Sequence, residues 1–244
     1  MIFYNKYMKF ILCIILSTLL FSAVYAESYG VYSPKDYSFN PNSTDATLFI
    51  LDFSNSMSEY MEGKSKANLM VDTLKRLLPA INPNTRVGLR IYGQRMGFTP
   101  AEACRASKLL VPISKLDISY LNSALDGAKP KGMTPITFSL KQAIKYDFIG
   151  VTGKKHIILL TDGGENCDES PCKFVMELIK LRKDILIDVI AFNISDEDDL
   201  DQLRCTSLVT GGKFYTANTA AELANSLENS ARGEKRVEAK ILVP

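Results

Sequence analysis

From Ala46 onwards, short apolar runs alternate with amphipathic stretches along nearly the whole chain. The runs have the length of strands, whereas the amphipathic stretches carry apolar residues three and four positions apart, as helices do. Strands that alternate with helices pair in parallel and form a doubly wound sheet with helices on both faces. We therefore predict a three-layer α/β domain built on a mostly parallel, six-stranded sheet.

The predicted strands are 46–53, 86–92, 108–113, 155–161, 185–192 and a short run that opens at 213–215. The predicted helices are 56–80, 114–128, 135–149, 170–183, 196–208 and 219–231. The run at 155–161 is the most apolar, which indicates a central place in the sheet. The run at 108–113 contains Pro112, and a proline, which has no backbone N–H, suits an edge strand.

The segment before the alternating pattern has the features of a secretory signal peptide. Lys6 and Lys9 precede an apolar run at 10–21, and Val24-Tyr25-Ala26 fits a small-residue cleavage site. The apolar run is short for a bilayer span, so cleavage after Ala26 is favoured over a retained anchor. The resulting organisation is a signal peptide at 1–26, an extended arm at 27–44, the domain at 45–232 and a C-terminal tail at 233–244.

Charge excludes one large class of partner. The chain has 29 basic and 27 acidic residues, and cleavage removes two lysines and no acid, leaving 29 − 2 = 27 basic residues against 27. No basic stripe remains that would bind nucleic acid. The mature chain is therefore predicted to be neutral. We also expect it to be monomeric on its own and, after cleavage of the signal peptide, to have no membrane span.

The cysteines support export. Cys13 lies in the signal segment, and four others remain: Cys104, Cys167, Cys172 and Cys205. An even number in an oxidising compartment predicts two disulfides, with three possible connectivities. Zinc binding is the competing interpretation, but the spacings contain no C-x₂-C pair.

The sequence leaves the connectivity open. Cys167 and Cys172 could pair with each other and stiffen the loop that contains them. Pairing with Cys104 would instead tie that loop to the loop after the second strand, and Cys104 could also pair with Cys205.

Polar residues lie where the strands of such a sheet present ligands, at their carboxyl ends. Asp52, Ser54 and Ser56 follow the first strand and alternate, so their side chains can point to one side. Thr134 lies in a turn before a predicted helix, and Asp162 directly follows the central strand. We expect these five side chains to surround one point.

Their chemistry is that of a hard cation site. Carboxylates and hydroxyls, without sulfur or imidazole, select Mg²⁺, or else Mn²⁺ or Ca²⁺, over zinc, copper or iron. Few carboxylates leave the ion charge partly uncompensated and a coordination position open, which suits an Asp or Glu side chain of a protein partner. A D-x-S-x-S pattern alone arises by chance in roughly one chain in sixteen of this length, so the order of the three clusters carries the prediction.

That order, D-F-S-N-S, G-M-T-P-I and L-L-T-D-G-G-E-N-C, resembles the metal-ion-dependent adhesion site of von Willebrand factor A domains. The closing T-G-G-K-F-Y-T-A-N also looks like the end of such a domain. E-N-C-D-E-S-P-C and Q-L-R-C-T resemble an exported bacterial subgroup with extra cysteines. The resemblance implies the doubly wound fold and a mostly protein- or matrix-binding role. It assigns the cation to Asp52, Ser54, Ser56, Thr134 and Asp162.

No enzyme is predicted. His156 is the only histidine and lies at the start of its strand, so we interpret it as structural and not as the base of a Ser-His-Asp triad. A phosphotransfer role for Asp52 would normally need a second Asp where Ser54 stands. The acidic run at 196–201 is interpreted as a solvated helix start, with a second cation site as the alternative.

The predicted function is an exported adhesion-type module, periplasmic or secreted, that captures an acidic residue of a protein through its cation. An assembly subunit of an envelope complex is the alternative. A metal-dependent hydrolase or phosphatase is a weaker one.

Overall fold

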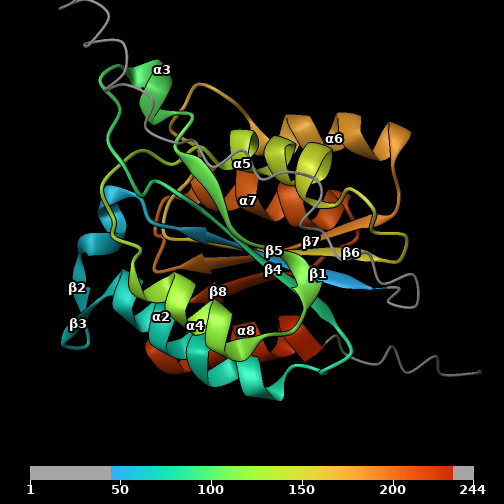
Figure 1. Ribbon diagram of the computed structural model, residues 1–244. Helices are drawn as coiled ribbons and strands as arrows, with labels where there is room; N and C mark the ends of the chain where they lie inside the picture. The colour runs from blue at the N-terminus through green and yellow to red at the C-terminus, as the bar shows by residue number, and fades with distance from the viewer. Residues whose placement is uncertain (1–44, 233–244) are drawn as a thin grey trace, which may run out of the picture. The chain divides into compact units, whose positions relative to one another are not determined.

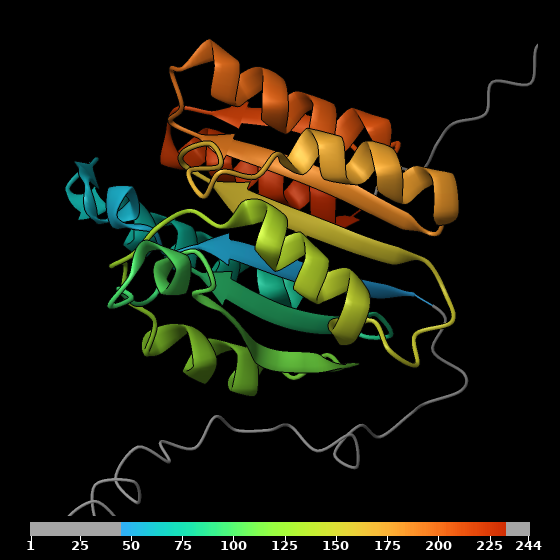
Figure 2. The same ribbon diagram turned by 90° about the horizontal axis from the view of Figure 1, so that it is seen from above.

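The computed structural model describes residues 45–232 and contains a six-stranded sheet of order β5-β4-β1-β6-β7-β8. Neighbouring strands are parallel except β4 and β5, which are antiparallel. Figure 2 shows the strands side by side. The strands are β1 (Ala46–Asp52), β4 (Arg86–Tyr92), β5 (Ser107–Lys115), β6 (Lys155–Thr161), β7 (Ile185–Phe192) and β8 (Phe214–Ala217). The mostly parallel, six-stranded sheet is confirmed.

The centre of the sheet is buried on both faces. Every residue of β1 is buried, and so is every residue of β6 except the half-buried His156. Parallel strands covered by helices on both sides need such continuous apolar runs. β6 is central, as predicted, and β5, which contains Pro112, is an edge strand.

Helices cover the two faces and give three layers (Figure 1). One face packs against α2 (Lys66–Leu77), α4 (Ile118–Asp126) and α8 (Ala220–Arg232). The other packs against α5 (Ile136–Gln142), α6 (Pro171–Leu181) and α7 (Glu197–Val209). Alternate residues of β1 serve the two cores: Phe49 and Leu51 face the first layer, Leu48 and Ile50 the second. Within 45–232, no helix is long and apolar enough to cross a membrane.

The single helix predicted over 56–80 is wrong in its first half. That half contains η2 (Asn55–Ser58) and a hairpin of β2 (Tyr60–Met61) and β3 (Lys64–Ser65), and only then α2 begins, followed by η3 (Leu78–Ala80). Glu62 and Gly63 have φ of 50° and 79°, the left-handed backbone that a tight hairpin turn requires. The polar middle of the segment is therefore a turn.

Two other helix starts differ from prediction. β5 extends to Lys115, so the helix predicted from Ser114 begins only at Ile118, where the Asp117 side chain caps it by accepting from the Tyr120 N–H at 2.9 Å. The helix predicted to start with Pro135 begins one residue later, at Ile136, and continues as the π-helical turn η4 (Ala143–Asp147).

Two disulfides join elements that are distant in sequence. Cys104–Cys167 connects the end of the short helix α3 (Pro100–Ala103) to the loop after β6, and Cys172–Cys205 connects α6 to α7. The prediction of two disulfides is confirmed, and the zinc alternative is excluded because all four sulfurs are used. Pairing of Cys167 with Cys172, or of Cys104 with Cys205, is also excluded. The predicted signal peptide, extended arm and tail lie outside the described residues.

Candidate metal centre

The topology brings the first and third polar clusters to the same edge of the sheet. β1 and β6 are adjacent and parallel, with Leu51 opposite Leu160. Asp52 ends β1, and Asp162 follows the last residue of β6. Because the carboxyl ends of parallel strands meet at one edge, the two aspartates emerge side by side.

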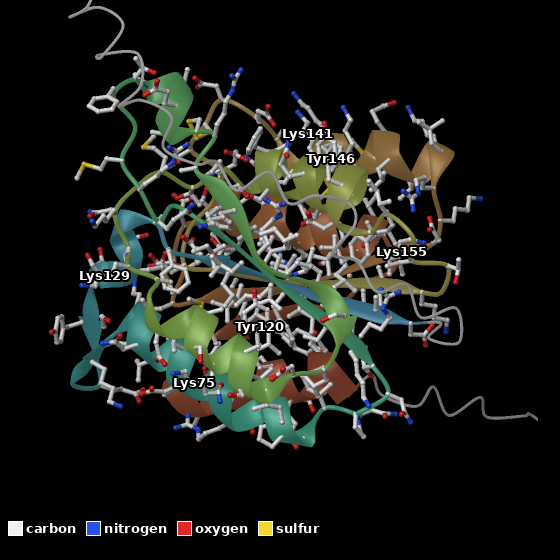
Figure 3. The ribbon with its side chains drawn as sticks, viewed as in Figure 1. Lys75, Tyr120, Lys129, Lys141, Tyr146 and Lys155 are labelled. Carbon is white, nitrogen blue, oxygen red and sulfur yellow. A yellow bond between two sulfur atoms is a disulfide. The ribbon has the colours of Figure 1, made fainter. Side chains whose placement is uncertain are left out.

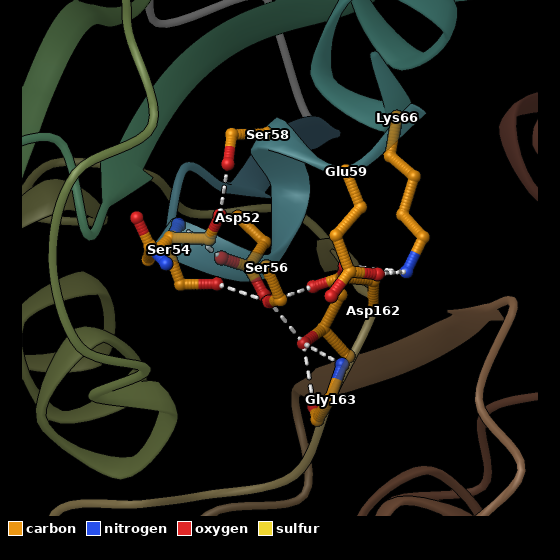
Figure 4. Close-up of polar contacts among 10 residues, drawn as sticks. Asp52, Ser54, Ser56, Ser58, Glu59, Lys66, Asp162 and Gly163 are labelled. Carbon is orange, nitrogen blue, oxygen red and sulfur yellow. Dashed lines mark hydrogen bonds and ion pairs between the residues drawn. The ribbon is translucent and has the colours of Figure 1, made fainter. Parts of the chain in front are cut away.

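A chain of hydrogen bonds links four of the five predicted residues (Figure 4). Asp52 Oδ1 accepts from the Ser54 N–H at 2.6 Å, and the Ser54 and Ser56 hydroxyls are 3.0 Å apart. Ser56 Oγ donates to Asp162 Oδ1 at 2.6 Å. Because that bond uses the Ser56 proton, Ser54 is the donor in the hydroxyl pair. Two carboxylates and two hydroxyls thus form one connected cluster.

Thr134 reaches this edge through its backbone. The preceding Gly132 forms a parallel bridge with Ser54, and its carbonyl accepts from the Asn55 N–H at 2.9 Å. On the other side, the Thr134 N–H donates to Asn166 Oδ1 at 2.6 Å. We call the loop after β1 the first loop, the loop before α5 that contains Thr134 the second, and the loop after β6 the third. Thr134 is buried between the first and third loops, although its hydroxyl makes no hydrogen bond with the other four residues.

Gly93, which sequence reasoning did not single out, holds the first and second loops together. Its carbonyl accepts from the Lys131 and Gly132 N–H groups at 3.1 and 2.7 Å. Its φ is 73°, and a Cβ at this position would lie 2.5 Å from the Ser54 nitrogen. Only glycine combines that backbone conformation with so close an approach. The signal in the sequence is a lone glycine at the end of a strand, which is too common to interpret.

The electrostatics of the cluster favour a cation. Burial, together with the charge of Asp162, raises the pKa of Asp52 to about 6, although the hydrogen bonds from Ser54 and Thr161 act to lower it. Burial also raises the pKa of Asp162, against the hydrogen bond from Ser56 and the charge of Lys66. Two buried carboxylates that oppose each other's ionisation are stabilised by a positive ion between them. The donor set and its charge therefore fit a hard divalent cation.

Lys66, the first residue of α2, is a second contributor that the sequence did not reveal. Its side chain is only 7% exposed, and its ammonium lies 3.1 Å from Asp162 Oδ2 and 2.8 Å from Glu59 Oε2 (Figure 4). Lys66 therefore offsets the charge of Asp162 but makes no ion pair with Asp52. Since Lys66 and Glu59 close the base of the hairpin, the hairpin is attached to the site.

Tyr92 and Thr161 lie on the strands that flank Asp52. Thr161 Oγ1 is 2.8 Å from Asp52 Oδ2 and 2.7 Å from the Gly163 carbonyl, so its proton has two acceptors. Tyr92 is opposite Asp52 in the sheet. Its hydroxyl is buried and makes no hydrogen bond with the described residues. Burial, followed by the charge of Asp52, raises the pKa of Tyr92 well above its usual value. Tyr92 therefore stays neutral and adds no charge to the site.

The third loop is fixed by side chains that accept from backbone N–H groups. The half-buried Glu165 accepts from the Thr137 and Cys167 N–H groups at 2.7 and 3.1 Å, and burial raises its pKa. Asp199 of α7 accepts from the Gly164 N–H at 2.9 Å. These bonds hold the backbone on both sides of Asn166.

The acidic run at 196–201 has a structural role. Asp196 caps α7 by accepting from the Asp199 N–H at 3.0 Å, as a helix start would. In the part of the chain that the structure describes, no group of three or more His, Cys, Asp or Glu side chains is arranged to hold a metal ion. The candidate centre has two carboxylates, and its remaining donors are hydroxyls.

His156 lies at the opposite end of β6. Its Nε2 is 3.1 Å from Asp188 Oδ2, an oxygen that also accepts from Ser230 Oγ at 2.7 Å. The serine bonds to the aspartate and not to the histidine, so these residues do not form a nucleophile and base pair. The arrangement agrees with a structural role for His156.

The model of the von Willebrand factor type A domain matches residues 48–230. The chain belongs to this family. Two relatives from Bacillus subtilis (strain 168) share most of its length. "Uncharacterized protein YwmC" is 30% identical over 205 residues, 80% of this chain and 88% of the relative. "Uncharacterized protein YwmD" is 26% identical over 191 residues, 77% and 84% of the two chains.

Solved structures share the von Willebrand factor A fold at lower identity. A von Willebrand factor type A protein from Catenulispora acidiphila has a TM-score of 0.61 at 18% identity over 78% of this chain. Proximal thread matrix protein 1 from the mussel byssus, with a zinc-occupied MIDAS motif, has 0.59 at 20% identity over 78%. The pilus adhesin SpaC from Lactobacillus rhamnosus GG has 0.60 at 16% over 79%. This chain spans 42%, 46% and 30% of those three chains.

Proposed function

We propose that this von Willebrand factor A domain is an exported, non-enzymatic module that binds another protein through a divalent cation. The cation, Mg²⁺ or else Mn²⁺ or Ca²⁺, is held by Asp52, Ser54, Ser56, Thr134 and Asp162. The observation that carries the proposal is the pair of buried carboxylates, Asp52 and Asp162, which are linked through Ser54 and Ser56 and of which Lys66 neutralises only Asp162.

A bound cation would supply a positive charge and an open coordination position for an Asp or Glu side chain of the partner. Ser54 and Ser56 contribute neutral oxygens, so the ion keeps much of its charge for that ligand. Asn166 and Glu165 accept hydrogen bonds from the Thr134 and Thr137 N–H groups, and so fix the position of the third loop relative to Thr134 in the proposed cation site.

The proposal of export rests on the two disulfides and on the predicted signal peptide. Disulfides persist in the periplasm and outside the cell, and they are rare in the cytosol. A role in adhesion or matrix binding is typical of this family, and the mussel thread protein and the pilus adhesin are examples by their descriptions.

The test is affinity capture on the purified chain from envelope and medium fractions of the source cells, with Mg²⁺ and with chelator. We expect a bound protein that is lost in chelator and with Asp52→Ala or Thr134→Ala. Ser123→Ala, at an exposed position of α4, serves as the control.

Capture that is unchanged in chelator and in both variants contradicts the proposal. A protein that stays bound in chelator but is lost with Asp52→Ala or Thr134→Ala would instead indicate that the chain is an assembly subunit of a larger complex. Phosphoester turnover abolished by Asp52→Asn indicates a hydrolase.

A further inference from the structure

The loop between β4 and α3 presents two large apolar side chains to solvent. Met96 is 74% exposed and Phe98 is fully exposed, at 102%. Isolated exposed apolar residues are normal, but two within three residues, beside a candidate binding site, indicate an interaction surface. Figure 1 shows α3 and the β2–β3 hairpin at the same end of the domain, where the candidate centre lies.

The backbone that carries these side chains is held at several points. Gly97 packs so closely on Ala103 that a Cβ would overlap the Ala103 nitrogen. The Phe98 N–H donates to Glu102 Oε2 at 2.8 Å, and Thr99 Oγ1 caps α3 by accepting from the Glu102 N–H at 3.2 Å. Because the loop is already ordered, burying Met96 and Phe98 against a partner costs little conformational entropy.

Four cations without ion pairs lie on the two segments that meet at Gly93 and Gly132. Arg95 lies between β4 and α3, Arg105 lies in the turn between α3 and β5, and Lys129 and Lys131 lie on the loop before Thr134. All four are exposed, and none forms a salt bridge with a described residue. Within 93–106 and 127–135 the only acid is Glu102, whose carboxylate already accepts from the Phe98 N–H. Lys129 lies at the end of the domain that carries the hairpin (Figure 3).

The two segments form one surface next to the candidate centre. Gly93 and Gly132 join them by a backbone hydrogen bond of 2.7 Å, and Gly132 also bridges to Ser54 of the centre. On the other side of the centre, the first turn of α7 presents the exposed acids Glu197 and Asp198. The two segments joined at Gly93 and Gly132 are therefore positively charged, whereas the first turn of α7 is negatively charged.

We propose that this surface is a specificity site for a protein partner, and we name it the β4 rim. Its residues are Arg95, Met96, Phe98, Arg105, Lys129 and Lys131. The partner is a peptide segment that carries further acidic residues and an aromatic or large aliphatic residue beside the carboxylate at the cation. The segment extends over the β4 rim because its charge is attracted there and repelled by α7. This inference rests on the proposed metal-dependent binding function.

The experiment is selection of a phage-displayed library of random dodecapeptides on the purified chain, in Mg²⁺ and in chelator. Selected peptides are then measured on variants of the β4 rim, Phe98→Ser, Met96→Ser and the double charge reversal Arg95→Glu/Lys131→Glu. Controls at the opposite edge of the sheet are Leu181→Ser, whose side chain is 87% exposed, and Lys183→Glu. All are surface positions, and thermal melting checks that each variant is folded.

We expect peptides enriched in Asp or Glu together with Phe, Tyr, Trp, Leu or Met, bound only in Mg²⁺. Phe98→Ser and the charge reversal should each weaken binding by about tenfold or more, with the controls unchanged. Mg²⁺-dependent peptides that lack these residues and tolerate every β4 rim variant overturn the inference and leave the proposed function intact. Acidic aromatic peptides that need Phe98 but not Mg²⁺ support the rim and contradict the metal-dependent function.

Two further outcomes also overturn the inference. The first is a selection that enriches no sequence in either buffer. The second is co-sedimentation of the chain with phosphatidylglycerol vesicles that is lost in Phe98→Ser, because basic and aromatic residues together also suit an anionic membrane.

Discussion

Asp52 is a buried carboxylate whose charge no cation of the described chain balances directly. Its two oxygens accept from the Ser54 N–H and from the Thr161 hydroxyl, while Lys66 pairs with Asp162. Ionisation of Asp52 therefore opposes folding when no metal is bound. Because its pKa is raised from 3.8 to about 6, the folded state binds a proton more tightly than the unfolded state, and the penalty is present above pH 6 and disappears as the pH falls to about 4.

We predict that Asp52→Asn stabilises the metal-free protein at pH 7 by on the order of 2 kcal/mol. The amide can accept from the Ser54 N–H and donate to Thr161 Oγ1, which then donates to the Gly163 carbonyl. Urea unfolding in chelator measures the difference, which should shrink towards zero near pH 4. A variant that is less stable than the wild type at pH 7, or a difference that does not change with pH, contradicts the assignment.

Lys66 gives a second prediction at this scale. Its substitution by Met should lower the stability of the metal-free protein by about 1–3 kcal/mol, since Asp162 loses its buried partner. The same change should tighten Mg²⁺ binding several-fold because a positive charge beside the site is removed. Calorimetric titration of Mg²⁺ measures the second effect, with Lys64→Met on the exposed hairpin as the control. Weaker Mg²⁺ binding in Lys66→Met would instead mean that Lys66 mainly positions Asp162.

The sequence predicted candidate ligands but not the residues that support them. Asp52, Ser54 and Ser56 stand in a short alternating pattern, and four of the five candidates indeed form one cluster. Lys66 and Asn166 act across loops, and their contacts depend on the tertiary fold. No local pattern marks a lysine that will be 7% exposed.

At the scale of elements, three loops at one edge of the sheet are joined mainly by backbone groups. Gly93 and Gly132 allow the first two loops to approach, and Asn166 ties the third loop to Thr134. The geometry of the centre therefore depends on residues that contribute no ligand atom.

We predict that Gly93→Ala destabilises the protein by about 2 kcal/mol or more and weakens Mg²⁺ binding. The added Cβ strains a backbone with φ of 73° and would lie 2.5 Å from the Ser54 nitrogen. Gly63→Ala is the matched control, because Gly63 has φ of 79° but nothing within 4 Å of a Cβ. The control should lose stability only, so equal loss of Mg²⁺ affinity in both variants would contradict the role of Gly93.

Secondary structure was predictable where the periodicity was long and unbroken. The apolar runs of β1 and β6 gave the central strands, and Pro112 indicated the edge strand. The hairpin at 60–65 was missed because apolar residues on both sides continue a helical spacing across it. Its local signal in the sequence is the polar Glu62-Gly63 pair, which adopts the left-handed backbone of the turn in the structure.

For the whole molecule, two disulfides reinforce a fold that already has two cores. Cys104–Cys167 closes a separation of 63 residues and lies next to Asn166, whereas Cys172–Cys205 closes 33 residues between α6 and α7. The even cysteine count predicted the number of bridges, but their pairing depends on which loops the fold brings together.

We predict that both double cysteine-to-serine variants lose stability by about 2–4 kcal/mol, measured by urea unfolding. Only the loss of Cys104–Cys167 should also weaken Mg²⁺ binding, because it frees the loop in which Asn166 holds Thr134. Equal Mg²⁺ affinity in the two variants would show that the hydrogen bonds of the third loop suffice without the bridge.

The most direct test of a cation site at this edge of the sheet is calorimetric titration of Mg²⁺ into chelator-treated protein, for the wild type and Thr134→Val. Valine keeps the shape of threonine but has a methyl group in place of the hydroxyl, which makes no hydrogen bond to the other candidate ligands. We predict binding of one ion per chain, at least about tenfold weaker in Thr134→Val. No binding of Mg²⁺, Mn²⁺ or Ca²⁺ by the wild type, or equal binding by Thr134→Val, would contradict the account.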